Sequence, residues 1–119
     1  MPKPRVYVET TIPSFYHDAG VSPAVVARRD WTRRWWSTAA ERFDLVTSEA
    51  VLVELVGADA TRSALRLSLL DHVPLLPIVP EIADVVATYI RRKLMPADPA
   101  GDALHLAIAS FHRCDFLVT

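Results

Sequence analysis

Short apolar runs alternate along the chain with longer stretches in which apolar and polar residues recur at helical spacing. The short runs predict strands, because β-branched and aromatic side chains pack well on a pleated surface. They cover residues 5–8, 44–47, 75–79 and 116–118. Pro77 lies inside the third run and cannot donate to a sheet ladder, so we predict that this strand lies at an edge.

The longer stretches predict helices between these strands. They cover residues 23–42, 49–59, 60–71, 80–94 and 99–113. Ser22 before Pro23 has the pattern of an N-cap, as does Asp98 before Pro99, and Ser48 is predicted to cap the second helix. Gly57 is a C-terminal signal in the second stretch. We expect loops at residues 10–20 and 95–99.

Alternating strands and helices predict an α/β fold with a mainly parallel sheet. The 119 residues are enough for one domain, which we place at residues 1–119. No apolar run approaches the ~20 residues that span a bilayer, and the N-terminus lacks the apolar part of a signal peptide, so we expect a cytoplasmic protein. The net charge of −1 excludes a strongly basic nucleic-acid binder, and the single cysteine, Cys114, excludes an internal disulfide.

Three carboxylates stand where a site could form. Glu9 closes the first strand, Glu54 lies inside the apolar segment VLVELV, and Asp102 precedes the apolar helical segment ALHLAIA. Burying an ionised carboxylate is costly unless it is paired or bound to a metal. Three such groups at one sheet edge repel one another, and a divalent cation offsets that repulsion. Oxygen-only ligands favour Mg²⁺ or Mn²⁺.

Each acid also has a simpler interpretation. Glu9 could be a solvated strand end, Glu54 could point outward or pair with an arginine, and Asp102 could complement the helix dipole. His105 lies on the same helix face as Asp102, either as a satisfied core histidine or as a partner of the acids. The segment ARRDWTRRWW, residues 27–36, could stack on bases, or it could pack its tryptophans inward and its arginines outward.

Three segments in order, VYVETTIPSFY, TSEAVLVEL and DALHLAIASFHRCDFLVT, resemble the PIN domain, and most closely the VapC-type toxins of prokaryotic toxin–antitoxin pairs. The resemblance covers essentially the whole chain. It implies a three-layer α/β/α sandwich and a Mg²⁺- or Mn²⁺-dependent ribonuclease. By motif, Glu9, Glu54 and Asp102 are the catalytic metal ligands, and Thr11 supports the site. The implied partners are an RNA substrate, a cognate antitoxin and a second copy of the chain.

The sequence departs from the family in two places. The first acid of the family is usually aspartate, whereas this chain has Glu9, whose extra methylene moves the carboxylate by about 1 Å. The fourth acidic position of the family would follow Thr119, so the resemblance implies that the last helix and strand of the fold are missing. These departures leave open a second function, a non-catalytic binding module with a PIN fold.

Overall fold

A computed structural model describes residues 2–92 and 102–119 of the chain. These residues form an α/β fold built on a four-stranded, all-parallel sheet with the strand order β3-β2-β1-β4. The central strand β1 pairs on both sides, with Val6 opposite Leu45 of β2 and Phe116 of β4. The strands are β1 (Arg5–Val8), β2 (Asp44–Ser48), β3 (Leu75–Leu76) and β4 (Phe116–Val118).

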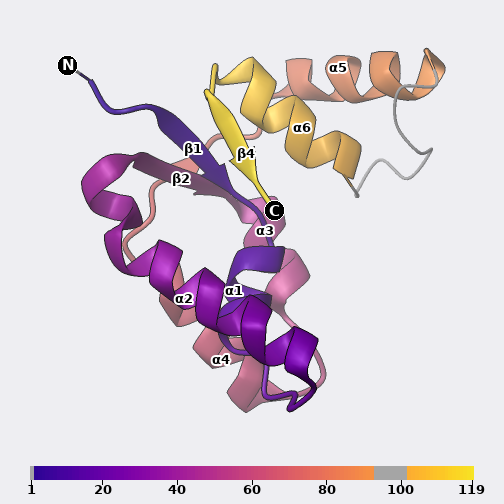
Figure 1. Cartoon of the computed structure of the whole chain (residues 1–119). Coiled ribbons are helices and arrows are strands. Elements are labelled where there is room, and N and C mark those ends of the chain that lie inside the picture. The colour runs from indigo at the N-terminus through magenta and orange to yellow at the C-terminus, as the bar shows by residue number, and fades with distance from the viewer. Residues whose placement is uncertain (1, 93–101) are drawn as a thin grey trace.

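The described residues contain six helices, which lie on both sides of the sheet. They are α1 (Thr11–Tyr16), α2 (Pro23–Arg42), α3 (Glu49–Leu55), α4 (Ala60–Leu69), α5 (Pro80–Arg91) and α6 (Asp102–Phe111). The chain moves along the sheet in one direction from β1 to β2 and on to β3, and in the opposite direction from β3 to β4. Because such crossovers are right-handed, the helices that connect strands in the two directions cover opposite faces of the sheet. Figure 1 shows this arrangement, with α1, α2 and α4 together on one side and α5 and α6 on the other. It is compatible with a three-layer sandwich.

All four predicted strands are present, and β3 is an edge strand as predicted. It is shorter than expected, because it ends at Leu76, before Pro77 would have to donate a ladder hydrogen bond. The prediction of a loop over residues 10–20 was wrong, because α1 occupies Thr11–Tyr16. Pro13 lies in the first turn of α1, where its missing N–H costs no helical hydrogen bond, and it is buried beside Ile12.

The remaining differences concern helix ends. Helix α3 ends at Leu55, ahead of Gly57, and α4 ends at Leu69, where residues 70–71 had been expected to continue it. Helix α6 ends at Phe111, two residues earlier than predicted. Helix α5 is described to Arg91, while the predicted residues 93–94, the loop at 95–99 and the start of the last helix lie outside the described residues. No described helix is both long and apolar enough to cross a membrane.

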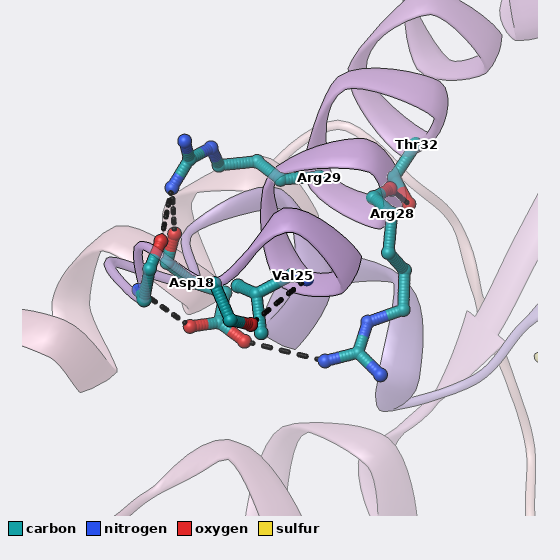
Figure 2. Close-up of polar contacts among 7 residues, drawn as sticks. Asp18, Val25, Arg28, Arg29 and Thr32 are labelled. Atoms are coloured by element: carbon teal, nitrogen blue, oxygen red, sulfur yellow. Dashed lines mark hydrogen bonds and ion pairs between the residues drawn. The ribbon is translucent and has the colours of Figure 1, made fainter.

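The predicted start of α2 is confirmed, and the turn before it is held by two arginines (Figure 2). Ser22 accepts a hydrogen bond from the backbone N–H of Val25 at 3.3 Å. One carboxylate oxygen of Asp18 accepts from the Gly20 N–H at 2.9 Å, and the other lies 3.5 Å from the Arg28 guanidinium. Arg29 donates to the carbonyls of both Asp18 and Gly20, so the turn is fastened to α2.

Two tryptophans of α2, Trp31 and Trp35, differ in whether they pack inward. Trp35 packs inward, with its ring stacked on Phe43 at a centroid distance of 6.1 Å. Trp31 is 66% exposed, so the interpretation in which the tryptophans pack inward does not hold for this one. Trp31 and Trp35 line an open apolar cavity of about 490 Å³ together with Ile12 and Val118.

Candidate metal centre

The carboxyl ends of β1 and β4 define the place where a site would be expected. The chain runs from β1 to β2 on one side of β1 and returns to β4 on the other, so the strand order reverses between β1 and β4. Ligands of open parallel sheets bind in the crevice outside the strands at such a point. Glu9 follows β1 there, and its backbone N–H donates to Val118 of β4 at 3.2 Å. The residue is only 9% exposed, so Glu9 is not a solvated strand end.

Glu54 reaches the same place from α3, held at both carboxylate oxygens. The hydroxyl of Thr10, immediately after Glu9 in the sequence, donates to Oε2 of Glu54. The other oxygen, Oε1, lies 2.8 Å from Nε2 of His105 on α6. The residue itself is exposed, but its carboxylate is held by these two contacts, and among the described residues it has no arginine partner. It faces residues from β1 and α6.

His105 is 2% exposed and has a polar partner at each ring nitrogen. Its Nδ1 lies 2.8 Å from the hydroxyl of Tyr7, which is itself 2.7 Å from the hydroxyl of Ser48. Burial raises the pKa of the Tyr7 hydroxyl above its usual range, with a smaller contribution in the same direction from the negative charge of Glu54. Tyr7 therefore keeps its proton and has one hydrogen to donate, either to His105 or to Ser48.

The ligand atoms of Glu9, Glu54 and His105 all lie within 4.8 Å of one another, so this group could hold a metal ion. Two carboxylates and an imidazole are ordinary ligands for a divalent cation. Among the described residues, no lysine or arginine forms an ion pair with either Glu9 or Glu54. A bound cation would supply the positive charge that this pair of carboxylates otherwise lacks.

Asp102 lies at the same cavity but outside this ligand group. Together with Glu9, His105, Leu117 and Thr119 it lines a hollow of about 230 Å³. Its side chain is exposed, in the first turn of α6, where it also complements the helix dipole. The structure thus places Asp102 at the same hollow as Glu9 and His105, whereas the third member of the potential ligand group is His105.

Thr11, the predicted supporting residue, lies within reach of Glu9. Its hydroxyl is 3.5 Å from Oε2 of Glu9 and 3.2 Å from the hydroxyl of Thr119. The neighbouring Thr10, which sequence reasoning missed, makes the shorter contact, to Glu54. Tyr7 and Ser48 were also missed. The one signal for them was a polar group within an apolar strand, since such a group must find a partner when buried.

The chain matches no protein-family model, no curated protein and no solved structure. The PIN-domain assignment therefore stays a prediction from the sequence motifs.

Proposed function

We propose that this protein is a metal-dependent endoribonuclease of the PIN-domain, VapC-like type. The observation that carries the proposal is the meeting of Glu9 and Glu54, from separate elements, at the strand-order reversal of a parallel sheet. A nearly buried glutamate beside a second carboxylate, with no lysine or arginine paired to either among the described residues, is an electrostatic reason to bind a divalent ion.

The residues of the cavity have distinct roles in this proposal. Glu9 and Glu54 would hold Mg²⁺ or Mn²⁺, and Asp102 would complete the oxygen ligands from the first turn of α6. A divalent ion there supplies activation of water and stabilisation of the charge that develops on a phosphodiester under attack. Thr10 keeps Glu54 turned toward the cavity, and Thr11 supports Glu9. The substrate would be RNA.

The partners follow from the same resemblance. A cognate antitoxin would inhibit the enzyme by covering the cavity, for example with an arginine aimed at the carboxylates. A homodimer, and activity in the cytoplasm, are further parts of the proposal.

The test is cleavage of a single-stranded RNA by the purified protein with added Mg²⁺ or Mn²⁺. Glu54→Gln and Asp102→Asn should each lower the cleavage rate by on the order of 100-fold or more, since each removes charge from the reacting centre. Glu41→Gln, an exposed acid on α2, is the matched control and should cleave like the parent. Equal rates in all four proteins, or no cleavage by a parent chain that binds the ion, would refute the proposal.

The position of Asp102 outside the ligand group favours a second candidate, a PIN-fold binding module without catalysis. Calorimetric titration with Mn²⁺ separates the two functions. A module that has lost catalysis through loss of its metal should show no heat of binding at millimolar Mn²⁺, whereas the ribonuclease should bind the ion in the absence of RNA.

A further inference from the structure

The short distance between His105 and Glu54 fits two different chemical situations. Nε2 of His105 and Oε1 of Glu54 are 2.8 Å apart. An N–H···O hydrogen bond has this length. Two neighbouring ligands of one ion, each about 2.1 Å from it and at a right angle, would be about 3.0 Å apart. The distance alone therefore does not decide whether Nε2 carries a hydrogen or a free lone pair.

The other ring nitrogen has the partner that a metal-binding histidine requires. When a neutral imidazole binds a metal through Nε2, its Nδ1 carries a hydrogen that must be donated to an acceptor. The hydroxyl of Tyr7, 2.8 Å away, can accept that hydrogen and donate its own to Ser48, 2.7 Å further on. Tyr7 and Ser48 are both fully buried, so this chain of hydroxyls is shielded from water.

The same chain can run in the opposite direction, because hydroxyl hydrogens rotate freely between acceptors. Ser48 then donates to Tyr7, Tyr7 donates to Nδ1, and Nε2 donates its hydrogen to Glu54. This direction suits the protein without a metal. Reversing it converts Nε2 from a hydrogen-bond donor into a ligand, without moving a heavy atom.

Glu9 gives a separate reason to expect a cation beside Nε2. The residue is only 9% exposed and lines the cavity, and among the described residues its side-chain hydrogen bond is the 3.5 Å contact with Thr11. With His105 neutral, neither Glu9 nor Glu54 has a positive partner among the described residues. A metal ion in contact with Glu9, Glu54 and Nε2 would satisfy all three groups at once.

We propose that His105 is itself a metal ligand through Nε2, and that the centre selects an ion that accepts nitrogen, such as Mn²⁺ or Co²⁺, over Mg²⁺. Imidazole suits transition ions such as Co²⁺, Mn²⁺ accepts nitrogen as well as the oxygen ligands it favours, and Mg²⁺ prefers oxygen ligands in strict octahedral geometry. The inference rests on the metal site of the proposed function and replaces its oxygen-only ligand set with a mixed one. Tyr7 and Ser48 are positioning residues that set which ring nitrogen carries the hydrogen.

The direct test is pulsed electron paramagnetic resonance of the full chain loaded with Mn²⁺. A coordinated imidazole gives a ¹⁴N coupling to the metal electrons, which a histidine that only donates to Glu54 does not give. The coupling should be present in the parent and lost in His105→Gln. The matched control is His72→Gln, which alters an exposed histidine far from the cavity and should keep the coupling. Mn²⁺ binding without any nitrogen coupling would overturn the inference, as would no binding of Mn²⁺ or Co²⁺.

A second measurement uses Ser48, whose hydroxyl pairs with Tyr7 and is not one of the potential metal ligands. In Ser48→Ala the hydrogen of Tyr7 has only Nδ1 left as an acceptor, so Nε2 keeps its own hydrogen and cannot bind the ion. The ratio of Co²⁺ to Mg²⁺ affinity, measured by calorimetry, should fall by roughly 10- to 100-fold. An unchanged ratio in a variant that folds normally by circular dichroism would contradict the proposed relay.

Failure of this inference and failure of the ribonuclease proposal give different results. RNA cleavage supported by an ion without nitrogen coupling would overturn the role of His105 and leave the ribonuclease standing. Nitrogen coupling in a protein that cleaves no RNA would support His105 as a ligand and overturn the ribonuclease proposal.

Discussion

The hydroxyl of Tyr7 lies 2.8 Å from Nδ1 of His105, although the two residues are 98 positions apart. Both are buried, and each depends on the other for a hydrogen bond that water cannot replace. Tyr7→Phe removes the hydroxyl and leaves Nδ1 and the Ser48 hydroxyl without this partner. We expect the free energy of unfolding, measured with urea, to fall by about 1–3 kcal/mol.

The control for that loss is Tyr89→Phe. The Tyr89 hydroxyl makes a longer, exposed contact of 3.4 Å with Ser110. Its removal should change the free energy of unfolding by less than about 0.5 kcal/mol. Similar losses in the two variants would show that the buried relay contributes no more than a surface hydrogen bond.

Glu9→Gln should have opposite effects with and without metal. In the metal-free protein it removes a nearly buried negative charge facing Glu54, so the free energy of unfolding should rise by on the order of 1 kcal/mol. Mn²⁺ at 100 times its dissociation constant should stabilise the parent by about 2.7 kcal/mol, and the variant by much less. Thermal melts with Mn²⁺ or with a chelator provide the measurement. A variant that is less stable than the parent with chelator present would contradict this account.

Asp18 should make the turn before α2 sensitive to acid. The Gly20 N–H, followed by the Arg28 guanidinium, lowers the pKa of the Asp18 carboxyl below its ordinary value of 3.8. Because folding lowers this pKa, ionised Asp18 stabilises the folded protein fully above pH 3.8. The stabilisation is lost as the pH falls through the pKa of Asp18 in the folded state. Asp18→Asn should therefore be less stable than the parent at neutral pH and equally stable in strong acid. Urea unfolding at neutral pH and in strong acid provides the measurement, and a variant as stable as the parent at both would contradict this account.

Two glycine-to-alanine substitutions should differ in their effect on the free energy of unfolding. A Cβ added at Gly20 would lie 2.9 Å from Cγ1 of Val25. Gly20→Ala therefore forces α2 or the side chain of Val25 to shift and should destabilise the protein by about 1 kcal/mol or more. At Gly57 the closest atom to an added Cβ is the Ser63 hydroxyl, at 3.8 Å. Gly57→Ala should therefore be neutral, or stabilising by about 0.4–1 kcal/mol through the unfolded chain. Urea unfolding of both variants checks the contrast.

The fold was predictable as far as local pattern determines it. Every strand was found, because each is a compact apolar run, and the edge position of β3 followed from Pro77. Helix α1 was not found, because its six residues are too few to show periodicity and Pro13 suggested a turn. Its helical form depends on the burial of Ile12 and Pro13 against the rest of the protein.

The candidate site was predictable at the level of strand ends and helix faces. Glu9 and Glu54 came together because parallel strands and the helices that follow them place their ends at one edge. His105 was recognised as a neighbour of Asp102, but helical spacing does not say which of the two turns toward Glu54. The contact between Tyr7 and Nδ1 orients the ring of His105 toward Glu54. This contact depends on the pairing of β1 with β4 and on the docking of α6, both of which are long-range.

The pairing of the first strand with β4 also determines when the cavity comes into being. The backbone N–H of Arg5 donates a hydrogen bond to the carboxylate of Asp115, 110 positions later. The backbone N–H of Glu9 donates one to the carbonyl of Val118. Contacts of such separation form late in folding, because a long loop must close before they are made. A chain still emerging from a ribosome thus carries Glu9 and Glu54 without the strand and helix that complete their surroundings. Because β4 ends at Val118, the hollow that Glu9 and His105 line cannot be complete before translation has passed residue 118.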